Sequence, residues 1–236
     1  MFFSVIRTLL AGGHIDIQSV IAQVLALIFV IVCILPLHEL AHGWVAYRLG
    51  DPTAKLERRL TLNPLASVDP IGTVWLFLFG FGWAKPVPVD PRYFKKPKRD
   101  MAIVALAGPV SNLLAALVGA LLLNVLVVIA GFGGTNGALY FIYSVLAYYV
   151  TVNVTLAAFN LLPIPPLDGS KILGAFLSDR ALATYYRYQN IFVMVLFFLM
   201  FSGAFSGPLY AIESAMTRGI FWIAGLPFRL FGLNFF

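Results

Sequence analysis

The chain has 236 residues, of which 61% are hydrophobic and 11% are charged. Soluble domains carry about 25% charged residues, so this composition excludes a soluble globular domain, a disordered chain and a nucleic-acid-binding module. The net charge is +6 and the basic residues are clustered, which in a membrane protein marks the cytoplasmic side. The one cysteine, Cys33, excludes an intrachain disulfide and a zinc site built on cysteines.

Long stretches without charged residues predict membrane-crossing helices, because a crossing needs about 20 mostly apolar residues. The uncharged stretch 17–38 predicts one crossing. The stretch 101–167 predicts two, separated by the glycine-rich turn 131–137. Two further apolar segments, about 190–205 and 208–226, bring the predicted number of crossings to about five.

A short apolar island, residues 71–84, lies inside the polar middle of the chain. It is too short for a helical crossing, and Gly72, Gly80 and Gly82 weaken a helix. We therefore predict a re-entrant or interfacial segment. Basic residues on both sides then place both flanks on the cytoplasmic face. Residues 1–13 lack the separate regions of a signal peptide, and residues 1–16 are predicted to form an interfacial or membrane-dipping segment.

His38, Glu39 and His42 form an H-E-x-x-H motif at the end of the first apolar stretch. Residues four apart share one face of a helix, so both imidazoles can bind one zinc ion. Glu39 then lies beside the ion as general base for the hydrolytic water. Ionisable groups inside a membrane are costly and mark functional sites. The alternative is a helix-end cluster whose side chains reach the membrane interface.

A hydrolytic zinc has three protein ligands and one open position, so a third ligand must come from elsewhere. The candidates are His14, Cys33 and the acidic residues. Asp168 is favoured because the two crossings predicted within 101–167 return it to the membrane face of the His pair. Prolines end the helix before it, and Gly169 permits close backbone approach. The alternative is that Asp168 caps the following helix.

Three other polar or helix-breaking positions lie on apolar helices. Asn112 and Asn160 are candidate donors to the oxyanion of a tetrahedral intermediate, and interhelical hydrogen bonding is the alternative. Pro36 lies two residues before His38, where it is expected to kink the helix and open space for water. The alternative is a proline that the membrane helix simply tolerates.

Three ordered motifs make the sequence resemble the site-2 protease family of intramembrane zinc metalloproteases. They are H-E-L-A-H at 38–42, A-G-P-V-S-N at 107–112, and N-L-L-P-I-P-P-L-D-G at 160–169. The stretch G-W-A-K-P-V-P-V at 82–89 resembles the small bacterial branch of that family. The resemblance covers more than half of the chain.

This resemblance implies a role for each matching residue. His38, His42 and Asp168 would bind one zinc ion per chain, Glu39 would be the catalytic base, and Asn160 would help to engage substrate. The resemblance also implies a β-like membrane segment at the island 71–84. Other branches carry a PDZ or a CBS domain, and the small branch has neither.

We therefore expect an all-α polytopic membrane protein with about five transmembrane helices plus a re-entrant or β-like membrane segment. It is expected to form one integral-membrane metalloprotease domain over 1–236. Within it, 1–16 form the interfacial N-terminus, 17–188 the catalytic core and 189–236 the C-terminal membrane helices.

The function expected is that of an intramembrane zinc endopeptidase, which hydrolyses peptide bonds in or near transmembrane segments of other proteins. The alternatives are a membrane zinc transporter and a catalytically inactive scaffold. A transporter predicts further His or Asp residues, which 101–167 lack, and the intact Glu39 disfavours an inactive scaffold. Expected partners are transmembrane substrates and the lipid bilayer, with no nucleic acid. The protein is expected to be multi-pass in the cell membrane, with its active site toward the cytoplasm.

Overall fold

The structure is a computed structural model that describes residues 17–79, 83–130 and 137–230. The interfacial segment predicted at 1–16, with His14, lies outside the described residues, as does most of the turn predicted at 131–137. All regular elements within the described residues are helices. There, the β-structure consists of one isolated antiparallel bridge between Val68 and Ala84.

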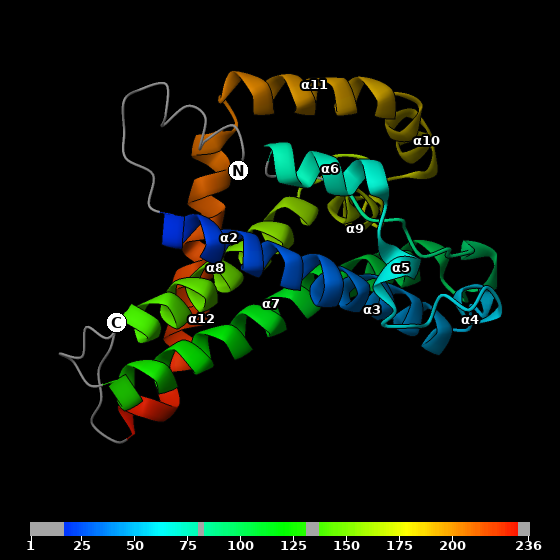
Figure 1. The fold of residues 1–236 in the computed structure, drawn as a ribbon. Coiled ribbons are helices and arrows are strands. Elements are labelled where there is room, and N and C mark those ends of the chain that lie inside the picture. The colour runs from blue at the N-terminus through cyan, green and yellow to red at the C-terminus, as the bar shows by residue number, and fades with distance from the viewer. Residues whose placement is uncertain (1–16, 80–82, 131–136, 231–236) are drawn as a thin grey trace.

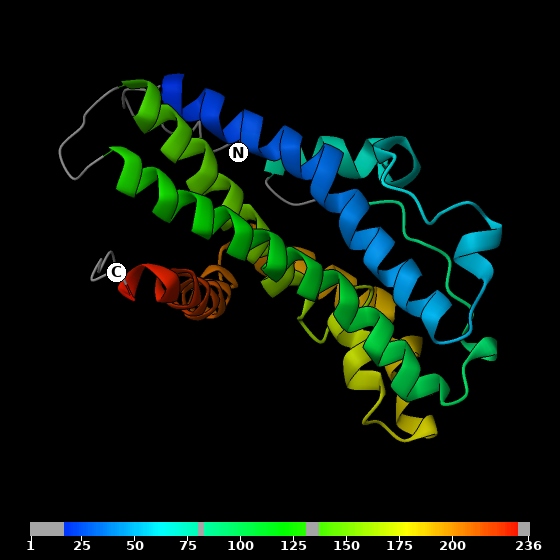
Figure 2. The same cartoon turned by 90° about the horizontal axis from the view of Figure 1, so that it is seen from below.

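Three helical stretches are long and apolar enough to cross a membrane: Val20–Arg48, Pro97–Ile129 and Gly137–Asn160. The first joins α2 (Ile17–Phe29), the π-helical turn η1 (Val30–Ile34) and α3 (Leu35–Arg48); the others are α7 (Pro97–Ala130) and α8 (Gly137–Asn160). They lie side by side along most of their length (Figures 1 and 2). The predicted polytopic all-α fold is thereby confirmed, and the three crossings predicted within 17–38 and 101–167 each correspond to a candidate span.

The C-terminal part does not confirm the predicted total of five crossings. Helices α11 (Gln189–Ser202) and α12 (Ser206–Arg229) meet at 88°, and together they count as one broken span or a re-entrant loop. The described residues therefore contain three candidate spans, or up to four if this bent pair crosses the membrane. Helix α11 has 14 residues, fewer than the roughly 20 that a crossing needs.

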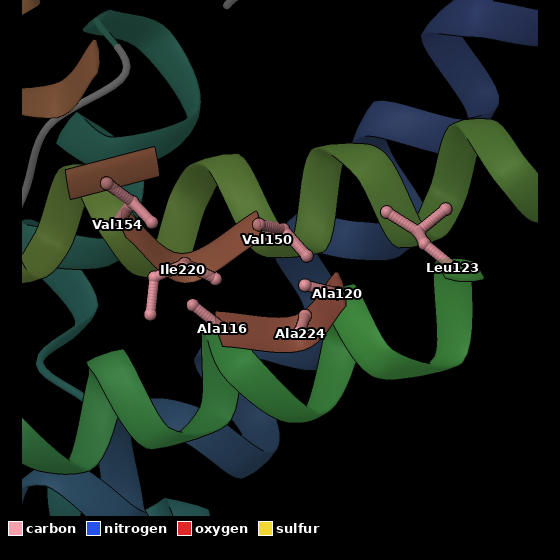
Figure 3. Packing of buried hydrophobic residues seen from close by; sticks show 7 residues of the cluster. All are labelled: Ala116, Ala120, Leu123, Val150, Val154, Ile220 and Ala224. Atoms are coloured by element: carbon pink, nitrogen blue, oxygen red, sulfur yellow. The ribbon is translucent and has the colours of Figure 1, made fainter. Parts of the chain in front are cut away.

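The main apolar cluster lies where α12 crosses α7 and α8 (Figure 3). Small side chains allow the backbones to approach closely in a membrane bundle, and Ala116, Ala120 and Ala224 are each fully buried here. The side-chain amide of Asn124 on α7 donates to the backbone carbonyl of Ala224 at 3.0 Å. Close packing and this interhelical hydrogen bond therefore hold α12 against the spanning helices.

The connection between α3 and α7 contains three short α-helices and one 3₁₀ turn: α4 (Thr53–Leu56), α5 (Pro64–Ser67), α6 (Pro70–Phe79) and η2 (Pro91–Tyr93). After α8 the chain forms α9 (Asp168–Gly174) and α10 (Asp179–Arg187). In Figure 1, α6 and α11 lie on the same side of the spanning helices, and the rings of Trp75 and Phe197 join them with centroids 5.8 Å apart.

The apolar island predicted at 71–84 is largely helical up to residue 79. Helix α6 is absent from the candidate spans, in agreement with a segment that does not cross. Its first turn is capped by Asp69, which accepts from the backbone N–H of Gly72 at 2.7 Å. Position 72 requires a glycine, because a Cβ there would overlap the backbone of Trp83. The β-like character is limited to the Val68–Ala84 bridge at its ends; Gly80 and Gly82 lie outside the described residues.

Candidate metal centre and active site

The His pair follows a wide turn in the first spanning helix. In this turn the backbone N–H of Leu35 donates to the carbonyl of Val30, which is the five-residue spacing of a π-helix. Pro36 has no N–H, and in a regular helix its ring would clash with the carbonyl four residues earlier. A π turn thus directly precedes Pro36, where the sequence predicts a kink, and α3 continues through His38 and His42.

Three buried side chains converge at one point between α3 and α9. The Nε2 atoms of His38 and His42 are 3.0 Å apart. Oδ2 of Asp168 lies 3.3 Å from the first and 3.1 Å from the second. Tetrahedral zinc with bonds of about 2.0–2.1 Å keeps its ligand atoms about 3.3 Å apart. The spacing of these three atoms thus fits one metal ion, and His38, His42 and Asp168 are the group that could hold it.

The hydrogen bonds behind the two imidazoles show which atoms face the centre. Nδ1 of His42 donates to the backbone carbonyl of Val104 at 2.7 Å. Nδ1 of His38 donates to Oδ1 of Asn112 at 2.9 Å. A neutral imidazole that donates through Nδ1 carries a lone pair on Nε2. Two lone pairs and one carboxylate oxygen therefore face one another in a buried space, which is unfavourable unless a cation lies between them.

Gly108 allows α7 to approach the two imidazoles. A Cβ at this position would lie 2.5 Å from both Cε1 and Nε2 of His38, and closer still to Nε2 of His42. Real Cβ atoms do not approach other atoms so closely. The backbone of α7 thus forms one wall of the metal centre only because residue 108 has no side chain.

Asp168 reaches the His pair from the first turn of α9. The N-cap of α9 is Leu167, which makes no side-chain capping hydrogen bond. The alternative that Asp168 caps this helix is therefore wrong. Gly169 permits the approach, because a Cβ there would lie 2.5 Å from the carbonyl carbon of Leu161. The return of the chain after α8 thus brings Asp168 to the His pair, as the topology predicts.

Glu39 lies beside the centre and is held by the extended segment that follows α6. Its Oε2 accepts a hydrogen bond from the backbone N–H of Val87 at 2.8 Å. Pro86 and Pro88 flank Val87 and have no N–H, so Val87 has the one backbone donor of this tripeptide. Glu39 therefore has one oxygen fixed to the backbone, and its other oxygen is free of hydrogen bonds from the part of the chain that the structure describes.

The proposed metal ligands and Glu39 line one cavity of about 520 Å³. Most of the other lining side chains are apolar and come from segment 83–89 and from α7 and α8. Asn160 and Lys171 add polar groups to the lining. A cavity with mostly apolar walls and a few convergent polar groups is typical of a ligand or substrate site.

The sequence profile of peptidase family M50 matches residues 26–203, well over half of the chain and including all of these side chains. The chain belongs to this family. The resemblance to site-2 proteases seen in the sequence motifs is thereby confirmed.

Bacterial and archaeal relatives resemble this M50 chain over much of its length. YwhC of Bacillus subtilis (strain 168), provisionally named a zinc metalloprotease, is 44% identical over 149 residues, 62% of this chain and 67% of its own. Rip2 of Mycolicibacterium smegmatis, with the same provisional name, is 32% identical over 214 residues, 80% of this chain and 77% of its own. MJ0611 of Methanocaldococcus jannaschii is 30% identical over 136 residues, 58% and 62% respectively. No solved structure matches the chain significantly.

The two asparagines predicted as oxyanion donors, Asn112 and Asn160, occupy different environments in this M50 chain. Asn160 lines the cavity, and its amide donates to the carbonyl of Leu156 on its own helix at 3.0 Å. Asn112 is fully buried behind His38 and is not part of the described cavity lining. The placement of Asn160 agrees with a role toward substrate, whereas that of Asn112 favours orientation of His38.

Sequence reasoning missed three contacts of the M50 site. These are the hydrogen bond from His38 to Asn112, the one from Val87 to Glu39, and the ion pair between Lys171 and Asp168 at 3.2 Å. One signal was present in the sequence. A glycine in a helical stretch costs about 1 kcal/mol relative to alanine, so Gly108 indicated a packing reason, although not which residue it contacts.

Proposed function

We propose that this M50 chain is an intramembrane zinc endopeptidase, which hydrolyses peptide bonds in or near transmembrane segments of other membrane proteins. The observation that carries the proposal is the convergence of His38, His42 and Asp168 within an apolar helical bundle, beside the free oxygen of Glu39. The relatives' provisional names support zinc as the metal. The spacing of the three donor atoms, 3.0 to 3.3 Å, suits that ion.

In this proposal His38, His42 and Asp168 hold the metal, and the other groups move the proton and place the substrate. Bound zinc supplies Lewis acidity, which polarises a carbonyl group and makes water more acidic. Glu39 takes a proton from the attacking water on its free oxygen, while Val87 holds the other oxygen in place. Glu39 then gives that proton to the amine that leaves when the peptide bond breaks.

The cavity supports an apolar peptide segment as the substrate. Leu35, Trp83, Leu156 and Phe159 are among its lining residues, and they offer apolar contacts to such a segment. A helical segment has its carbonyls in internal hydrogen bonds, so it must unwind locally before it can be cut. Asn160 is placed to give a hydrogen bond to the exposed backbone or to the oxyanion.

The orientation proposed for the site is toward the cytoplasm. Many of the basic residues lie in the connection between α3 and α7, and cytoplasmic loops carry an excess of lysine and arginine. The metal centre lies near that connection, because Glu39 contacts Val87 within it. The proposed partners are transmembrane protein substrates within the bilayer.

The test compares the parent protein with Glu39→Gln, co-expressed with a panel of single-span membrane proteins. We expect the parent to cleave at least one substrate within or near its span. Glu39→Gln should retain stoichiometric zinc and lose cleavage, because the amide cannot accept the proton. If the protein is instead a zinc transporter, the Glu39→Gln variant should still transport zinc. Equal cleavage by the parent and the variant would show that Glu39 is not the base.

A further inference from the structure

The two carboxylate oxygens of Asp168 have different partners. Oδ2 faces Nε2 of His38 and Nε2 of His42, at 3.3 and 3.1 Å. Oδ1 lies 3.2 Å from Nζ of Lys171, one helical turn later in α9. One oxygen of the carboxylate therefore faces the metal centre, and the other faces an ammonium group.

The side chain of Lys171 lies at the partly exposed edge of the metal centre. Its side chain is 40% exposed, whereas that of Asp168 is 9% exposed. Lys171 also lines both the cavity of the metal centre and a second cavity of about 290 Å³, which lies toward α10. The ammonium group thus keeps part of its hydration while it reaches a nearly buried carboxylate.

A carboxylate can give a metal either one oxygen or two. A catalytic zinc keeps one position open for water or substrate beside its three protein ligands, and a second oxygen from the same carboxylate would make the water-bound ion five-coordinate. Groups that hydrogen-bond to the ligands orient them and tune the metal. An ammonium group on Oδ1 holds that oxygen away from the metal.

We infer that Lys171 is a positioning residue, which restricts Asp168 to one metal-binding oxygen and so keeps the water-bound ion four-coordinate. This inference rests on the proposed metal centre. It assigns Lys171 a specific task, since a residue that only stabilised α9 would affect retention of the metal and not the number of its ligands.

The experiment uses the full chain in detergent, loaded with cobalt(II) in place of zinc. The variants are Lys171→Met, Lys171→Arg and, as matched control, Lys98→Met. Lys98 lines the same second cavity, but its Nζ pairs with Asp179 at 2.6 Å and donates to the carbonyl of Leu177 at 2.8 Å. Visible absorption reports coordination number, because four-coordinate cobalt absorbs more strongly than five-coordinate cobalt. Metal content and kcat are measured on the same preparations.

We expect Lys171→Met to retain one cobalt, to lose visible absorption intensity, and to lose about 10-fold or more in kcat. Lys171→Arg and Lys98→Met should keep the parent spectrum. An unchanged spectrum in Lys171→Met overturns the inference, and so does loss of the metal from that variant. Failure of the parent itself to bind cobalt or zinc is a different outcome, because it overturns the proposed function.

Discussion

The carboxylate of Glu39 and the backbone N–H of Val87 are joined by a 2.8 Å hydrogen bond across 48 residues of sequence. This contact links the first spanning helix to the extended segment that forms one wall of the cavity. Because prolines stand on both sides of Val87, neither neighbouring residue can replace this donor. The position of the proposed base therefore depends on one backbone amide.

Replacement of Val87 by proline removes that amide and should lower peptidase activity. Misplacement of a catalytic group by about 1 Å can cost on the order of 100-fold in rate. We expect a loss of that order for Val87→Pro, with zinc content unchanged, measured by substrate cleavage and metal analysis. Val87→Ala keeps the N–H and should stay near the parent. Equal losses in the two variants would mean that the side chain of Val87, not its amide, matters.

Asn112→Ala should weaken zinc binding, because Nδ1 of His38 loses the acceptor that orients its ring. Loss of such a partner costs about 10- to 100-fold in metal affinity, which competition with a chelator measures. The matched control is Asn124→Ala, which removes another fully buried asparagine from α7. Since Asn124 bonds to α12 and not to the metal centre, zinc affinity should be retained. Comparable affinity losses in both variants would refute the orienting role of Asn112.

Gly108→Ala should abolish metal binding, because the new methyl group would overlap the two imidazoles. Zinc at 100 times its Kd stabilises a protein that binds it only when folded by about 2.7 kcal/mol. The parent should therefore melt at a higher temperature with zinc than after chelation, and Gly108→Ala should not. Gly219→Ala is the control, since a Cβ at that site in α12 meets no atom within 4 Å. A zinc-dependent shift in Gly108→Ala would contradict the close approach of α7.

The proposed orientation in the membrane predicts which exposed positions react with an impermeant thiol reagent. In a Cys33→Ala background, Lys95→Cys should be labelled only after the cytoplasmic side becomes accessible. Tyr140→Cys, near the start of α8, should be labelled in intact cells, because α7 lies between the two positions and crosses the membrane. The reverse pattern would place the metal centre toward the outside.

Local sequence patterns predicted the metal ligands and the base, but not the residues that hold them in position. The spacing of His38 and His42 on one helical face is a local property, and the return of Asp168 follows from the uncharged stretches between them. By contrast, Asn112, Val87 and Lys171 contact the site through tertiary packing and the course of loops. No spacing in the sequence determines which carboxylate oxygen or which ring nitrogen these residues meet.

The number of crossings near the C-terminus was hard to predict, because it too depends on tertiary structure. Hydropathy shows that 190–205 and 208–226 are apolar, but not how the helices are directed. The left-handed conformation of Gly203, with φ of 75°, ends α11 there, and the next helix turns by 88°. The prediction that the island 71–84 does not cross agrees with the ten-residue length of α6, but this helix depends on the Asp69 cap and on the fit of Gly72 against Trp83.

The π turn at Val30–Ile34 divides the first spanning helix into two halves with separate tasks. The half before it packs along α8, and the half after it carries the metal ligands toward α7. Each residue in a helix advances the side chains by about 100° around the axis. The π turn absorbs that rotation for one extra residue, so deletion of one residue here would restore a regular helix and leave the His pair facing Asp168. The two halves therefore share one angular register, although the helix holds one residue more than a regular helix would over the same length.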